Sequence, residues 1–207
     1  MSRKDVAIVA LTGGPCGGKS SLFDALKERQ HLGGRSLCFV PEAATILIND
    51  GCDSGDVEDF QRAILGLQLE LEAHAMEQAY AMGVPAAVIC DRGTMDGAAY
   101  CTADQFVRVM AAHGYSREAL LARYDLVVHL VSAAVDAPEA YTTGNNEARF
   151  EDLNGAIDQE YKTRTAWLEH PNRLVLGGYD SFAAKLQAAV DAIESYLESC
   201  DGELHVR

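Results

Sequence analysis

The chain has 207 residues, of which 48% are hydrophobic and 23% are charged, a balance typical of a folded protein and not of a disordered one. The formal net charge of −14 argues against a general nucleic-acid-binding surface, because a field of that sign repels phosphate backbones and anionic membranes. No stretch approaches the roughly 18–20 uninterrupted apolar residues of a membrane span, and the N-terminus has no signal-peptide pattern, so we expect a cytoplasmic protein.

The first predicted elements surround a glycine-rich loop. An apolar run at 6–11 predicts a buried strand, and residues 21–27 have the spacing of the first turns of a helix. Between them, residues 13–20 read G-x-x-x-x-G-K-S. In such a P-loop the backbone N–H groups converge on a phosphate, and the helix N-terminus adds its positive dipole. The sequence therefore predicts a site for a nucleoside triphosphate, ATP or GTP.

Individual residues of this loop have expected roles. Lys19 reaches the β- and γ-phosphates, and the Ser20 hydroxyl binds Mg²⁺. The expected nucleotide-binding residues are Gly14, Pro15, Cys16, Gly17, Gly18, Lys19, Ser20 and Ser21. The Cys16 thiol lies among N–H donors, and both a redox-sensitive and an incidental role stay open for it.

The remaining chain alternates strands with helices. Five apolar runs predict buried strands: residues 6–11, 36–40, 86–90, 126–131 and 173–176. Helices are expected at 21–27, 43–49, 57–82 and 182–200, in two or three short segments after 93, and in a charged stretch at 147–169. Strands that are almost entirely apolar predict a parallel sheet covered on both faces, in a single α/β domain over residues 1–207.

Three polar residues follow two of the predicted strands, and ligands of parallel α/β sheets bind at the carboxyl ends of strands. Glu42 is either a general base or a first-turn residue favoured by the helix dipole. Asp91 is either a carboxylate that binds Mg²⁺ together with Ser20 or a helix cap. Arg92 either clamps a phosphoryl or acceptor group or forms an ion pair with Glu42 or Asp96.

A further cation is expected from a loop. Residues 132–146 are small and polar and predict a mobile loop, so we expect a lid at about 132–150. Arg149 is the preferred arginine for stabilising the transferred phosphoryl group. Arg164 is the second choice and Lys162 the third, with a solvated helix face as the alternative for all three.

Other side chains have weaker signals. His129 lies inside an apolar strand and reads as a satisfied core histidine, and Tyr100 either lines an acceptor pocket or only packs. Phe106, Val107 and Met110 predict the apolar stripe of one of the short helices.

Five segments together resemble one P-loop domain: residues 12–20, 40–44, 90–93, 96–100 and 145–149. This AAA_28-like domain is shared by bacterial nicotinamide-riboside kinase/regulator proteins and a channel-trafficking, GTP-binding photoreceptor protein. The resemblance covers residues 5–195 and is closer to the second branch, which it also resembles at 166–171.

The resemblance implies a three-layer, kinase-like fold with a parallel five-stranded sheet in the order 2-3-1-4-5, helices on both faces and a lid after the fourth strand. In the kinase relatives the acidic residue of the second strand and the D-R motif serve acceptor and Mg²⁺ chemistry, in agreement with the roles of Glu42, Asp91 and Arg92. The trafficking branch usually carries a second domain, which is a β domain. No function of that domain is transferred to this chain.

These patterns predict a Mg²⁺-dependent phosphotransferase that moves the γ-phosphoryl group of ATP or GTP to a hydroxyl of a small molecule. Its expected catalytic residues are Lys19, Glu42, Asp91, Arg92 and Arg149. The alternative is a nucleotide-dependent switch or NTPase that acts through a protein partner. Glu42 with Arg92 favours the kinase, because a switch needs no base on the acceptor side, and the N-K-x-D motif of Ras-type GTPases is missing from the sequence. The oligomeric state is open, with a dimer as one option.

Overall fold

The computed structural model describes residues 5–52, 55–138 and 153–202. The strands are β1 (Val6–Thr12), β2 (His31–Leu32), β3 (Arg35–Val40), β4 (Ala86–Asp91), β5 (Leu126–Leu130) and β6 (Arg173–Leu176). The helices are α1 (Lys19–Arg29), α2 (Ala43–Asn49), α3 (Val57–Ala81), the 3₁₀ helix η2 (Asp96–Ala99), α4 (Ala103–Ala112), α5 (Arg117–Leu121), α6 (Ala133–Asp136), α7 (Leu153–Ala166) and α8 (Phe182–Gly202).

The strands form one sheet in the order β2-β3-β4-β1-β5-β6. Five of these strands, all except β2, are parallel. When these five are renumbered 1 to 5 along the chain, their order is 2-3-1-4-5, which confirms the expected architecture. The additional strand β2 pairs antiparallel with β3 at the edge of the sheet. Gly33 and Gly34 have φ of 52° and 74°, and two consecutive positive φ values make the tight hairpin turn that joins β2 to β3.

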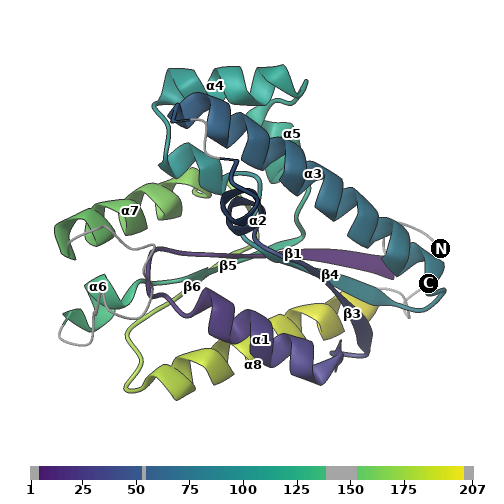
Figure 1. Ribbon diagram of the computed structural model, residues 1–207. Helices are drawn as coiled ribbons and strands as arrows, with labels where there is room; N and C mark the ends of the chain where they lie inside the picture. Colours follow the sequence, from purple (N-terminus) through teal and green to yellow (C-terminus); the bar gives the residue numbers. More distant parts are fainter. Residues whose placement is uncertain (1–4, 53–54, 139–152, 203–207) are drawn as a thin grey trace.

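Helices cover both faces of the sheet (Figure 1). Alternate side chains of β1 enter two separate cores, because successive residues of a strand point to opposite faces. Val6, Ile8 and Ala10 pack in the core beneath α3 and α4. Ala7, Val9 and Leu11 pack in the core against α1 and α8. The result is a three-layer α/β fold.

Two predictions about local structure were wrong in part. On α4, Phe106 and Met110 are buried, but Val107 is 57% exposed and Val109 takes its place in the core. The stretch expected as a loop from 132 begins with a short helix, α6, because the Ser132 hydroxyl accepts a hydrogen bond from the N–H of Ala134 and caps it. Most of the expected lid lies outside the described residues.

The described helices include none that is both long and apolar enough to cross a membrane.

Candidate functional site

Three strand ends meet at one cavity of about 570 Å³. The P-loop follows β1, Glu42 lies two residues after β3, and Asp91 is the last residue of β4. The charged residues that line the cavity are Lys19, Glu42, Asp91, Arg92 and Asp96. Its apolar lining comes mainly from α2, α3 and α4 and includes Ile48, Val57, Phe60, Ile64, Leu65 and Phe106. The structure thus brings the predicted catalytic residues together, apart from Arg149, which lies outside the described residues.

The P-loop packs closely against the end of β5. A Cβ atom on Gly13 would lie 2.1 Å from the carbonyl oxygen of Leu130, and one on Gly17 would lie 2.5 Å from the same atom. Both positions therefore require glycine. Cys16 adopts a left-handed φ of 56°, which costs energy for a residue with a side chain. The loop is a tightly fitted and strained segment.

Of the eight expected nucleotide-binding residues, four line the cavity: Pro15, Cys16, Lys19 and Ser20. The Lys19 ammonium donates hydrogen bonds to the carbonyl oxygens of Gly13 at 2.7 Å and of Gly14 at 2.8 Å. Burial and the nearby charge of Arg92 lower the pKa of Lys19 to about 8 against the opposing pull of neighbouring carboxylates. A polyphosphate at this position would favour the charged ammonium.

Arg92 lies between two carboxylates. Its Nε donates to Glu42 Oε1, and its Nη1 donates to Asp96 Oδ2 at 3.1 Å. The Thr45 hydroxyl donates to the second oxygen of Glu42 at 2.6 Å. Burial alone would raise the pKa of Glu42, but Arg92, Thr45 and Lys19 together lower it. The ion pairs that were one alternative for Arg92 are both present, and Glu42 is also the N-cap residue of α2.

Asp91 has the opposite electrostatic setting. Burial and the nearby charge of Glu42 raise the pKa of its carboxyl group to about 6, although Lys19 and Arg92 act the other way. A further positive charge beside Asp91 would therefore lower this pKa and stabilise the site.

The donors at this position suit Mg²⁺, which prefers oxygen ligands and keeps several from water and phosphate. The carboxylate of Asp91 and the hydroxyl of Ser20 both belong to residues that line the cavity. Within the described residues no group of three His, Cys, Asp or Glu side chains gathers to hold a metal. A Mg²⁺ ion here would depend on phosphate oxygens and water for its other ligands.

Asp96 is held in place by two residues that do not line the cavity. Its Oδ1 accepts hydrogen bonds from the Thr12 hydroxyl and from the indole N–H of Trp167, both at 2.6 Å. Trp167 is fully buried, and its ring lies so close that a Cβ on Gly93 would contact it at 2.7 Å. The sequence had offered Asp96 as an ion-pair partner of Arg92, and it drew attention to Trp167 only through the family resemblance. The contact between Asp96 and Trp167 was not predicted.

The backbone of Arg92 has a left-handed φ of 74°, and buried polar groups of α3 support it. Gln68 donates from its amide nitrogen to the carbonyl oxygen of Arg92 at 3.3 Å and to Glu72 at 2.9 Å. Glu72 in turn accepts hydrogen bonds from Arg123 and Tyr124. This network was not predicted from the sequence. Gln68 and Glu72 are polar residues on the buried face of α3, and that position is the signal that identifies them.

Two further candidates are placed away from the cavity. Lys162 forms an ion pair with Asp158 on its own helix at 2.6 Å, and both side chains are exposed. Arg164 is also exposed, and neither cation lines the cavity. Tyr100 does line it. The position of Arg149 as the preferred cation stays a prediction.

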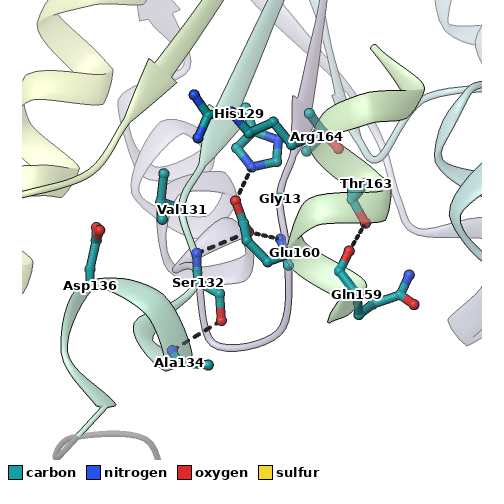
Figure 2. A network of polar contacts seen from close by, with 12 residues as sticks. Gly13, His129, Val131, Ser132, Ala134, Asp136, Gln159, Glu160, Thr163 and Arg164 are labelled. Carbon is teal, nitrogen blue, oxygen red and sulfur yellow. Dashed lines mark hydrogen bonds and ion pairs between the residues drawn. The ribbon is translucent and has the colours of Figure 1, made fainter. Parts of the chain in front are cut away.

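A second polar cluster lies where the P-loop meets β5 and α7 (Figure 2). The Glu160 carboxylate accepts hydrogen bonds from the N–H groups of Gly14 and Ser132 and from His129 Nε2. His129 is a core residue, as predicted, but only one of its ring nitrogens is satisfied, because Nδ1 is buried without a hydrogen-bond partner in the described structure. No sequence signal had pointed to Glu160.

The three-layer α/β fold and the loop at the end of the central strand β1 define the class: this is a P-loop nucleotide-binding domain. Within that class the chain belongs to the AAA_28 family, whose model, described as an AAA domain, matches residues 8–179. No curated protein matches the chain.

Proposed function

We propose that the protein is a small-molecule kinase, which transfers the γ-phosphoryl group of ATP or GTP to a hydroxyl of an acceptor. The observation that supports this best is the composition of the cavity. The P-loop residues Lys19 and Ser20 share one space with the apolar side chains of Phe60, Ile64 and Phe106. A nucleotide switch needs the first group alone, whereas a kinase must also hold a second substrate beside the phosphate.

In this proposal Lys19 binds the β- and γ-phosphates, and its two backbone acceptors, the carbonyl oxygens of Gly13 and Gly14, hold it beside the loop until then. Ser20 and Asp91 would hold Mg²⁺, which would supply positive charge beside the transferred group. Arg149 supplies the additional positive charge. All of these residues belong to one domain in this proposal, which spans residues 1–207.

Glu42 acts as the base that accepts the proton of the acceptor hydroxyl. Its pKa is lowered in this structure mainly by the charge of Arg92, in opposition to burial. Glu42 therefore becomes an effective base only when Arg92 turns from it toward the transferred phosphoryl group. The second partner of Arg92, Asp96, is fixed by Thr12 and Trp167, so the guanidinium keeps an anchor during this exchange.

The charges that line the cavity also restrict the chemical class of the acceptor. Its only cations within the described residues are Lys19 and Arg92, and the first serves the nucleotide while the second already faces Glu42 and Asp96. An acceptor with its own phosphate or carboxylate would lie among three acids without a matching cation. We therefore expect an acceptor with an apolar body, a hydroxyl group and no anionic group.

The test is incubation of the protein with Mg²⁺ and ATP or GTP in the presence of hydroxyl compounds, in pairs of a neutral compound and its carboxylated or phosphorylated analogue. The readouts are free phosphate and an acceptor mass increase of about 80 Da, the mass of one phosphoryl group. Transfer to neutral members supports the proposal. Phosphate release without any modified acceptor would favour the switch or NTPase, and Lys19→Ala is the matched inactive control.

A further inference from the structure

One carboxylate on α7 joins the P-loop to the end of β5. Glu160 Oε2 accepts the N–H of Gly14 at 2.9 Å and the N–H of Ser132 at 3.0 Å, while Oε1 accepts His129 Nε2 at 2.6 Å. Figure 2 shows the side chain pointing from α7 into the space between the P-loop and the end of β5. Glu160 is 1% exposed and His129 is fully buried, so water does not replace these bonds.

Gly14 packs closely against Glu160. A Cβ on Gly14 would lie 2.7 Å from Glu160 Oε2 and 3.0 Å from its Cα. A second hydrogen bond holds the P-loop: the Ser132 hydroxyl donates to the carbonyl oxygen of Pro15. Gly14 does not line the cavity, whereas Pro15 and Cys16 do. Glu160 therefore contacts the P-loop at a residue outside the lining of the cavity.

The carboxylate is ionised in this setting. Burial alone would raise the pKa of Glu160, but the hydrogen bonds and charge of His129 and the two N–H groups outweigh burial and lower it. The ammonium of Lys185 on α8 also interacts with the charge of Glu160, but it donates its hydrogen bond to the carbonyl oxygen of Val131 and lies 3.9 Å from Asp136. A buried charge of this kind is stable only while its partners stay in place.

We propose that Glu160 is a positioning residue for the nucleotide: it holds the start of the P-loop so that the following N–H groups face the phosphates, and His129 holds Glu160. Because the φ of Cys16 is strained, we expect the loop to relax to another conformation when that anchor is lost. The inference rests on triphosphate binding at the P-loop, the first step of the proposed function, and it does not depend on which acceptor is used.

Two substitutions test the carboxylate and its support. Glu160→Ala removes all three hydrogen bonds, and bonds to a charged group are strong enough that we expect Mg²⁺-ATP to bind at least about tenfold more weakly. His129→Leu removes the donor at similar volume and should weaken binding in the same direction. His129→Gln places an amide nitrogen near the position of Nε2 and should restore affinity to within about threefold of wild type.

The control is Ala156→Gly, at a buried residue of the same helix, which weakens α7 but keeps the Glu160 carboxylate and its hydrogen bonds. Affinity is measured by calorimetry on the full chain, and hydrogen exchange of the Gly14 and Ser132 amides is followed by NMR. Faster exchange at both amides together with lost affinity in Glu160→Ala, but unchanged affinity in Ala156→Gly, supports the proposal.

Three outcomes would overturn it: equal affinity of wild type and Glu160→Ala, equal losses in Glu160→Ala and Ala156→Gly, or no difference between His129→Leu and His129→Gln. The last comparison decides the matter if Glu160→Ala does not fold. A wild-type protein that binds no triphosphate would instead remove the proposed function itself, so the two failures are distinguishable.

Discussion

Replacement of Asp91 by asparagine should make the protein more stable and less active. The folded environment raises the pKa of this carboxyl group from its ordinary 3.8 to about 6. Ionised Asp91 therefore costs stability at neutral pH. Two pKa units correspond to about 3 kcal/mol, and because the carboxylate is partly exposed we expect about 1–2 kcal/mol of this to appear.

The pH dependence follows from the direction of the shift. A folded pKa above the unfolded value means that the folded chain binds the proton more tightly, so stability falls as pH rises from about 4 to 6 and the full cost applies above that range. Asparagine does not titrate. The stability gain of Asp91→Asn should therefore be full at about pH 8 and fall to about a third at about pH 4.5.

The assay is metal-free thermal unfolding of wild type, Asp91→Asn and the control Asp24→Asn, an exposed change on α1. A gain of about 1–2 kcal/mol corresponds to a rise in melting temperature of roughly 2–8 °C for a chain of this length. With Mg²⁺-ATP added, wild type should gain stability and Asp91→Asn should gain much less. An Asp91→Asn protein that is no more stable than wild type at about pH 8 would refute the reasoning about burial.

The remaining predictions concern the other proposed catalytic residues. Lys19→Ala should abolish triphosphate binding, measured by calorimetry, because the cation for the β- and γ-phosphates is lost; unchanged binding would contradict the P-loop assignment. Glu42→Gln should keep nucleotide affinity but lose about 10²–10⁴-fold in transfer rate, and an intact rate with reduced stability would make its role structural. Arg149→Ala should lower the rate more than the affinity in steady-state kinetics, and a loss of affinity alone would mean that it only binds the ground state.

The sheet was predictable because each parallel strand is a continuous apolar run, and the site was predictable where a motif is local. Residues 13–20 form a complete P-loop pattern, and Asp91 and Arg92 directly follow an apolar strand. The carboxyl ends of parallel strands then place these groups at the same edge. The two-residue strand β2 was not predicted, because so short a segment has no periodicity.

Long-range polar contacts could not be predicted. Gly14 and Glu160 are 146 residues apart in the chain. The sequence of α7 is that of a charged helix, in which the buried carboxylate of Glu160 cannot be distinguished from solvent-exposed ones. The choice between an ion pair and a phosphate clamp for Arg92 also depended on geometry. The structure shows that Glu42 and Asp96 both reach it, and no spacing rule fixes that arrangement.

The indole of Trp167 gives the protein a built-in optical probe. It is the single tryptophan of the chain, and it donates to Asp96, the same carboxylate that binds Arg92. If Arg92 turns toward a transferred phosphoryl group as proposed, its guanidinium moves relative to Asp96, and the electric field at the indole changes. Intrinsic fluorescence should therefore respond to filling of the cavity without any added label. The response should vanish in Arg92→Met and persist in Arg108→Met, which removes an exposed arginine on α4 that is paired with Glu58.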